Sequence, residues 1–452
     1  MPKTTRRHFV VGCSAAVAGM SGARFGSLLF ADTEMPYNNE TLIVVFARGG
    51  MDSMNLVFPV SGVDRGHYEA ARPDIKVPVN EGLPLDGQFG IHPAVGQLHN
   101  VYQAGRLAVV HAAGVPLGNR SHFDSQAFME LGTPGNNQGS TGWLARHFQS
   151  AYNLPPEIVM PSISVSSIQT TSLLGDHDSI NMSDPGDFNL QVGPWEWRDA
   201  QRLAMRNLYS SDDTWLHTSS LQALDAMDII EIHASGGYTP ANGAEYPNSS
   251  FGRHLKVVAQ MIKLGLGLRV ATIDIGGWDT HNGQGDGSGG YFASRVGELG
   301  GGLAALYTDL GGFGGTDYTN NTTVVLQSEF GRRLRQNADR GTDHGHGGVM
   351  LVMGGTTIGG VHGTWPGLAN DQLYDGADLA VSTDFRRVLS EILIRRMGNN
   401  SLGVVFPGYA DYQPLGVVHG TDLPPDYSPG GALLFRDGFE SGDASVWSGS
   451  QG

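Results

Sequence analysis

Metal-binding residue types gather in one glycine-rich stretch in the last third of the chain. The segment TDHGHGG places Asp343, His344 and His346 among glycines. Asp and Gly are common turn residues, so one interpretation is a simple turn. The other is a metal site, because imidazole and carboxylate groups are metal ligands and glycine lets the backbone fold closely around an ion.

Residues that could take part in the same chemistry stand elsewhere in the chain, each shortly after an apolar segment. These residues are Asp52, Ser121, His122, Asp279, His281 and Glu329. Each apolar segment leads into a polar loop rich in glycine. The question is therefore whether the fold brings these loops to one place.

Five apolar segments predict the strands that must position these loops. They are continuous rather than alternating, which is typical of parallel strands buried on both faces. They cover residues 41–47, 106–114, 269–277, 322–331 and 348–355. Patterns of helical period lie between them, at residues 121–132, 251–267 and 382–398.

Alternating strands and helices predict an α/β fold with a doubly wound, mostly parallel central sheet and helices on both faces. Ligands of such sheets bind beyond the carboxyl ends of the strands, so the loops after the first four strands are expected to meet. The segment TDHGHGG precedes the fifth strand. We expect it to reach the other loops only by turning back.

The first 31 residues carry the features of an export signal. Arg6 and Arg7 precede Phe9 and a short apolar stretch, which resembles a twin-arginine signal peptide. The sequence therefore predicts a periplasmic or secreted protein. The single cysteine, Cys13, lies inside this segment. A metal in the remaining chain would then be held by His, Asp, Glu or hydroxyl groups.

The charge of the chain argues against two classes of partner. The 28 basic and 44 acidic residues give a net charge of −16. Without residues 1–31, which contain four basic residues and no acidic one, the charge is 24 minus 44, or −20. Such an acidic surface disfavours nucleic acid and anionic membranes. The apolar stretch of the signal is too short for a permanent membrane span, which needs about 20 residues.

The sequence predicts one main domain over residues 36–410. Residues around 150–250 are interpreted as an inserted cap region over the site. Residues 411–452, rich in Pro, Gly and Asp, are interpreted as a C-terminal tail.

Six segments together resemble one known family. They are TLIVVFARGGMDSMNLVFP, RSHFDSQAFMELG, TGWLARH, GGWDTHNGQ, LQSEFGRRLRQN and GTDHGHGGVMLVMGG. In this order they are similar to domain-of-unknown-function family 1501, which is placed in the alkaline phosphatase superfamily beside the sulfatases. The resemblance implies an alkaline-phosphatase-like fold with metal ions at the strand ends and a hydroxyl nucleophile.

The resemblance also implies roles for single residues. Ser121 is the candidate nucleophile, and its alternative role is to cap the helix that it opens. Arg48, Arg120 and Arg332 are candidate clamps for an anion, and their alternative role is to form structural ion pairs. The candidate ligands of a divalent ion (Zn, Mn, Fe, Mg or Ca) are Asp52, Asp279, His281, Glu329, Asp343, His344 and His346. This chain departs from the superfamily at Phe330, which stands where those enzymes have a metal-binding histidine.

Three functions are compatible with this pattern. The first is an exported, metal-dependent hydrolase of small phosphate or sulfate esters. The second is a non-catalytic surface protein that binds a metal, a glycan or an anion on the same fold. The third is a redox metalloprotein, because His and carboxylate ligands also suit iron.

Overall fold

The computed structural model describes residues 37–155, 158–186, 188–189, 194–234 and 237–429. The predicted signal peptide and the last part of the predicted tail lie outside these residues. The chain divides into two compact units, and the first contributes only residues 37–38 and 153–155 to the described part. All features below belong to the second unit.

Strands and helices alternate along this unit. The strands are β1 (Thr41–Ala47), β2 (Val57–Pro59), β3 (Leu83–Pro84), β4 (Phe89–Ile91), β5 (Leu107–Gly114), β6 (Ser162–Ser164), β7 (Ser179–Asn181), β8 (Val270–Ile275), β9 (Thr322–Gln327), β10 (Gly348–Gly354), β11 (Gly360–His362) and β12 (Thr383–Asp384). The helices are α2 (Ser53–Leu56), α3 (Gly62–Ala71), α4 (Gly96–Gln103), α5 (His122–Leu131), α6 (Trp143–Ser150), α7 (Arg198–Tyr209), α8 (Trp215–Ala234), α9 (Ser250–Leu264), α10 (Gly290–Asp309), α11 (Phe385–Arg395) and α12 (Leu402–Val405).

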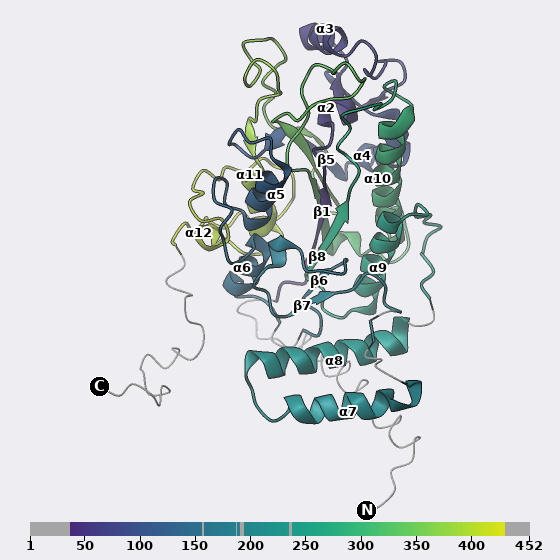
Figure 1. The fold of residues 1–452 in the computed structure, drawn as a ribbon, viewed down its shortest axis with the longest axis vertical. Helices are drawn as coiled ribbons and strands as arrows, with labels where there is room; N and C mark the ends of the chain where they lie inside the picture. The colour runs from purple at the N-terminus through teal and green to yellow at the C-terminus, as the bar shows by residue number, and fades with distance from the viewer. Residues whose placement is uncertain (1–36, 156–157, 187, 190–193, 235–236, 430–452) are drawn as a thin grey trace, which may run out of the picture. The chain divides into compact units, whose positions relative to one another are not determined.

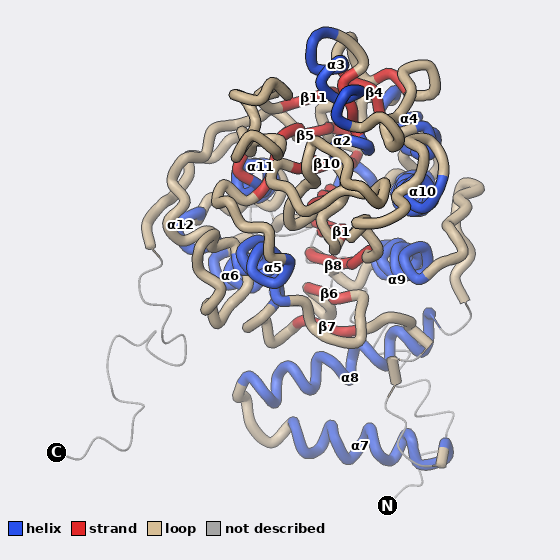
Figure 2. The backbone as a smooth tube through the Cα atoms, turned by 45° about the horizontal axis from the view of Figure 1, so that its top comes forward, coloured by secondary structure: helices blue, strands red, loops and turns tan. Residues whose placement is uncertain are grey.

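The central sheet is mostly parallel. Within the described residues it has nine strands in the order β11-β5-β10-β9-β1-β8-β6-β7, with β12 paired to β5 (Figure 2). Each of the five predicted strands is present. The predicted class, an α/β fold with a mostly parallel sheet and helices on both faces, is confirmed.

One strand runs against the others, contrary to the prediction. β10 pairs antiparallel with both β5 and β9. Its first residue, Gly348, therefore lies at the edge where the parallel strands end, opposite Ala113 near the end of β5. For this reason TDHGHGG reaches the other loops directly and does not have to turn back.

Two apolar layers cover the sheet. β1 shows why, because its side chains alternate between the faces. Ile43 and Val45 pack in a core with residues of α4, α9 and α10, whereas Leu42 and Val44 pack with residues of α5, α6, α11 and α12. Figure 1 shows these two groups of helices on opposite sides of the sheet. All seven residues of β1 are buried, which explains its continuous apolar sequence.

The segment interpreted as a cap contributes to the central sheet. β6 pairs with β8, and β7 pairs with β6, so both strands extend one side of the sheet. α7 and α8 lie side by side and are joined by ion pairs, among them Arg202 with Asp228 and Glu231. Within the described residues, none of the contacts of the site below comes from this segment.

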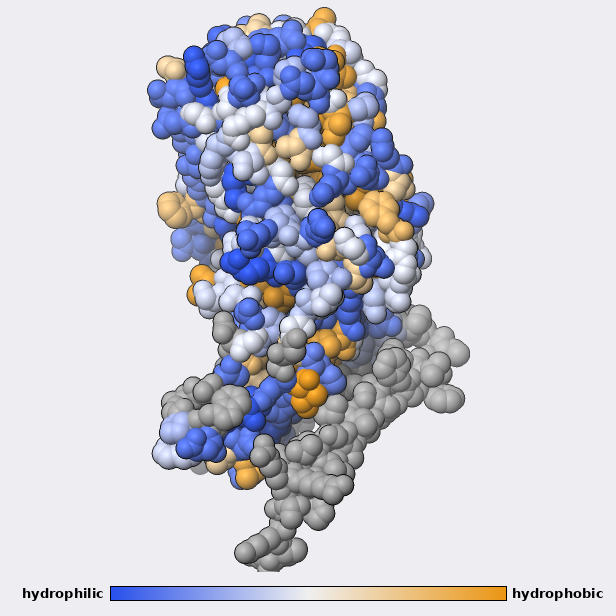
Figure 3. Space-filling model, turned by 90° about the vertical axis from the view of Figure 1, so that its right-hand side faces the viewer, coloured by the Kyte–Doolittle hydropathy of each residue, from blue (hydrophilic) through white to orange (hydrophobic). Residues whose placement is uncertain are grey.

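No helix in the described part of the chain is long and apolar enough to cross a membrane. On the face shown in Figure 3, hydrophobic side chains are scattered among hydrophilic ones.

Candidate metal centre

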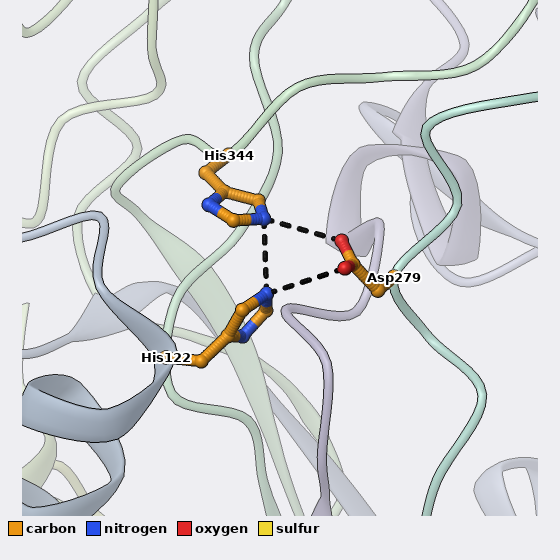
Figure 4. Close-up of side chains that lie close together, drawn as sticks. All are labelled: His122, Asp279 and His344. Carbon is orange, nitrogen blue, oxygen red and sulfur yellow. Dashed lines mark hydrogen bonds and ion pairs between the residues drawn. The ribbon is translucent and has the colours of Figure 1, made fainter.

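Three histidines and one aspartate meet where the parallel strands end. The Nε2 atom of His344 lies 2.9 Å from Nε2 of His122, 3.0 Å from Nε2 of His281 and 3.1 Å from Oδ1 of Asp279. Asp279 also lies 3.0 Å from Nε2 of His281 and, through Oδ2, 3.6 Å from Nε2 of His122. Figure 4 shows His122 and His344 turned toward each other and toward the carboxylate of Asp279. We call these four residues the histidine cluster.

Three separate loops supply the histidine cluster. His122 is the first residue of α5, shortly after β5. Asp279 and His281 follow β8, and His344 lies in the segment before β10. The parallel direction of β5 and β8 and the opposite direction of β10 together place all three loops at one edge.

The other ring nitrogen of each histidine faces an oxygen. Nδ1 of His344 lies 2.9 Å from the backbone oxygen of Arg120, and Nδ1 of His122 lies 2.7 Å from Oε1 of Glu329. Nδ1 of His281 lies 3.3 Å from Oδ1 of Asp343. Carbonyl and carboxylate oxygens only accept, so each Nδ1 donates to its oxygen when that nitrogen carries the proton. This is the arrangement in which metal-binding histidines are usually held.

The cluster fits a divalent ion. When each Nδ1 is protonated, the Nε2 atoms of the neutral rings point lone pairs at one another and at a carboxylate. Such a group needs a cation or extra protons between its members. Ligands of a tetrahedral zinc ion, at about 2.0–2.1 Å, lie roughly 3.3 Å apart, and the distances of 2.9–3.6 Å found here bracket that value. The side chains whose ligand atoms all lie within 4.8 Å of one another are His122, Asp279 and His344, with His281 beside them. Two imidazoles and one carboxylate suit Zn²⁺, Mn²⁺ or Fe²⁺ better than Ca²⁺ or Mg²⁺, which prefer oxygen ligands.

The charges around the cluster keep its carboxylates ionised. Burial favours the neutral form of Asp279, but the hydrogen bond and charge of Arg332 lower its pKa to about 2. Burial also opposes ionisation of Glu329, but hydrogen bonds from His122 and Gln126 lower its pKa below the usual range. The hydrogen bond to Glu329 in turn raises the pKa of His122, whereas burial lowers the pKa of His344.

Two of the predicted ligands lie away from the cluster. Asp52 is fully buried, and its Oδ2 accepts hydrogen bonds from Arg72 at 2.7 Å and from Gln284 at 2.5 Å. The ring of His346 packs against Tyr374, with 4.2 Å between the ring centroids, and burial lowers its pKa to about 4. In this structure Asp52 neutralises a buried arginine, and His346 is a packed aromatic residue.

Glu329 and Asp343 hold histidines in place. Glu329 accepts from His122 and also from the backbone N–H of Gly49 at 2.8 Å. Asp343 accepts from His281 and from Asn337 at 3.1 Å. Both were predicted as ligands, but here each lies behind the histidine that faces the cluster.

The residues predicted to act on the substrate have structural contacts. Ser121 caps α5, and its Oγ accepts from the backbone N–H of Asp124 at 3.4 Å. Arg48 pairs with Glu130 at 3.0 Å and with Asp274 at 2.6 Å. Arg120 pairs with Asp378 at 2.5 Å and Asp375 at 3.2 Å. Ser121 is placed beside the cluster because the next residue is His122.

Sequence reasoning named His122 among the loop residues but did not assign it as a ligand. A signal was present, because a cationic histidine is unfavourable in the first turn of a helix, where the helix dipole is positive. A histidine there is better suited to present a neutral ring. The resemblance that guided the ligand set gave no role to this position.

One family model matches part of the chain. A model described as "Protein of unknown function (DUF1501)" matches residues 197–400. This range includes Asp279, His281 and His344 but begins after His122. No curated protein matches the chain.

Two solved structures resemble the chain weakly. One is the crystal structure of Ps i-CgsB in complex with k-i-k-neocarrahexaose, with 11% identity, 78% of this chain and 71% of that chain covered, and a TM-score of 0.36. The other is the phosphonate monoester hydrolase of Agrobacterium radiobacter, with 11% identity, coverages of 83% and 79%, and a TM-score of 0.30. Neither likeness is close enough to assign a site or an activity.

Proposed function

We propose that this chain is a metal-dependent hydrolase of small anionic esters, a phosphate or a sulfate, exported by the twin-arginine pathway. The observation that carries the proposal is the convergence of three Nε2 atoms on Asp279, with every Nδ1 anchored by an oxygen. His122, Asp279 and His344, whose ligand atoms all lie within 4.8 Å of one another, would hold the ion, and His281 lies beside Asp279 and His344. A bound divalent ion supplies Lewis-acid stabilisation of the negative charge that develops on the ester oxygens.

The chain's own residues would then orient the reactants. Glu329 and Asp343 fix the rings of His122 and His281, so the ligand set is formed in advance. Ser121 remains the proposed nucleophile. Its Oγ accepts only a long cap hydrogen bond of 3.4 Å, and the hydroxyl proton is not used by that bond, so the proton stays available for transfer to a base.

Metal analysis with an ester screen tests the proposal. The purified protein is analysed for bound metal and assayed with an aryl phosphate and an aryl sulfate, with and without a chelator. We expect bound metal and turnover that the chelator abolishes. Bound metal without turnover of either ester would favour the non-catalytic alternative, and absence of metal would refute the centre itself.

Two variants separate the chemical role of Ser121 from its role as a cap. Ser121→Ala removes both the hydroxyl and the cap, whereas Ser121→Asn keeps a good N-cap without a nucleophilic hydroxyl. If Ser121 is the nucleophile, both variants lose turnover while Ser121→Asn keeps the stability of the wild type. Activity in Ser121→Asn would assign the attack to another group.

A further inference from the structure

We infer that the centre holds a single metal ion and that the guanidinium group of Arg332 is the second, permanent cation of the site. The inference rests on the proposed metal centre and concerns how many ions it takes.

Arg332 sits in a cage of oxygen atoms. Its side chain is fully buried and lies 2.6 Å from Oδ1 of Asp279. It also donates to the backbone oxygens of Gly50 at 2.5 Å, Thr342 at 2.9 Å and Trp278 at 3.1 Å, and to that of Gly49. Several carbonyl oxygens and one carboxylate are the kind of environment that holds a hard cation. Arginine keeps its charge in proteins, so this positive charge cannot dissociate as an ion does.

The carboxylates near the cage each have an oxygen that is already engaged. Oδ2 of Asp52 accepts from Arg72 and Gln284, whereas its buried Oδ1 has no hydrogen-bond partner among the described residues. Oε1 of Glu329 accepts from His122, Gln126 and Gly49. Among the described residues, the one group of three or more side chains whose ligand atoms could share an ion is His122, Asp279 and His344. In the described part of the chain, a second ion would find no second group of three such side chains.

Phe330 fills the space against the histidines. Its ring centroid lies 4.8 Å from that of His122 and 5.0 Å from that of His344, and the side chain is buried. The ring also lies against Gly50, whose φ is +63° and where an added Cβ would come within 2.3 Å of the ring. A phenyl ring offers no ligand atom, so this place is closed to an ion.

Arg332 also joins the loops that carry the ligands. Its bonds reach Gly49 and Gly50 after β1, Trp278 and Asp279 after β8, and Thr342 two residues before His344. It is therefore a positioning residue, which orients Asp279 and fixes the distance between two ligand loops before an ion binds. The same contact divides the charge of Asp279 between the guanidinium and the ion.

Metal stoichiometry tests the inference directly. The wild-type protein is loaded with Zn²⁺ or Co²⁺, freed of excess ion and analysed by mass spectrometry for metal per chain. We expect one equivalent, and two equivalents or none would overturn the inference. Turnover is a separate readout, because one ion without ester hydrolysis keeps this inference and refutes the proposed function. Two ions with ester hydrolysis would overturn this inference and support the proposed function.

The role of Arg332 is tested with a neighbouring arginine as control. Arg332→Gln is expected to weaken Co²⁺ binding about 10–100-fold, as outer-shell changes commonly do, and to alter the Co²⁺ absorption spectrum. Arg332→Lys, which keeps the charge, should recover part of this loss. Arg335→Gln removes an exposed arginine three residues further along the chain and should leave the affinity unchanged. Equal Co²⁺ affinity in Arg332→Gln and the wild type would overturn the role of Arg332. If Arg332→Gln does not fold, the metal stoichiometry of the wild-type protein still decides the number of ions.

Discussion

The Nε2 atom of His122 lies 2.9 Å from the Nε2 atom of His344, although 222 positions separate the two residues in the chain. Nδ1 of His122 faces Glu329 and Nδ1 of His344 faces the backbone oxygen of Arg120, so neutral rings that donate from Nδ1 point the lone pairs of both Nε2 atoms at each other. The two nitrogens are held close by a fold that has already fixed their rings. A cation is the simplest group that makes this contact favourable.

We expect His122→Ala to abolish metal binding at micromolar metal concentrations, because it removes one of the converging nitrogens. The measurement is a titration with Co²⁺ followed by absorption, or competition with a coloured chelator. His67→Ala is the matched control, since His67 is an exposed histidine of α3. Wild-type affinity in His122→Ala would exclude His122 as a ligand and leave its closeness to His344 without a role.

Glu329→Gln should weaken metal binding by about 10–100-fold without removing a ligand. The carboxylate of Glu329 increases the electron density of the His122 ring and fixes its orientation, and a neutral amide does this less well. Competition with a chelator measures the change. Glu69→Gln serves as the control, because Glu69 is an exposed residue of α3 that pairs with Arg65. This variant should bind metal as tightly as the wild type does. If Glu329→Gln binds as tightly as the wild type, Glu329 does not act through His122.

Arg72→Met should cost about 3–5 kcal/mol of unfolding free energy while the folded protein still binds its metal. Arg72 and Asp52 are both fully buried and lie 2.7 Å apart, so removal of the arginine leaves a carboxylate without its partner away from water. Urea denaturation measures the loss, and metal analysis of the folded fraction measures binding. Loss of metal at unchanged stability would instead show that Asp52 belongs to the centre, as the sequence predicted.

The strands of this fold were predictable because their burial leaves a direct mark on the sequence. β1 is buried at every residue, so its sequence is apolar throughout and does not alternate with polar residues. The direction of β10 was not predictable, because a strand has the same composition in either direction and only its pairing with β5 and β9 decides. The strands β6 and β7, with the sequences SIS and SIN, are too short to leave a pattern.

The site was predictable only in part, for a related reason. Asp279 and His281 follow β8 in a glycine-rich loop, where the rule for parallel sheets places ligands. His344 precedes β10 and reaches the same edge only because β10 is antiparallel. Asp52 has the same type of position after β1, yet its partner Arg72 is 20 residues away on another element. Nothing in the local sequence distinguishes a carboxylate that faces an ion from one that faces a buried arginine.

Buried histidines outside the centre should make the protein sensitive to acid. His111 on β5 is 2% exposed and packs against Phe89 and Trp365, and neither of its ring nitrogens has a hydrogen-bond partner among the residues that the structure describes. Burial lowers its pKa from 6.5 to about 3 in the folded protein. Between pH 6.5 and about 3, His111 therefore binds a proton in the unfolded chain but not in the folded protein. The stability that the neutral ring contributes is complete above pH 6.5 and is lost progressively as the pH falls toward 3.

At pH 5 this loss amounts to about 2 kcal/mol for His111, since each unit below 6.5 costs about 1.4 kcal/mol. His111→Phe replaces the imidazole with an apolar ring of similar shape. Between pH 8 and pH 5, the unfolding free energy of this variant should therefore fall by about 2 kcal/mol less than that of the wild type. Urea denaturation at the two pH values measures the difference. His233→Phe changes an exposed histidine of α8 and should keep the wild-type dependence. An unchanged pH dependence in His111→Phe would mean that the buried ring of His111 is not what resists protonation in the folded protein.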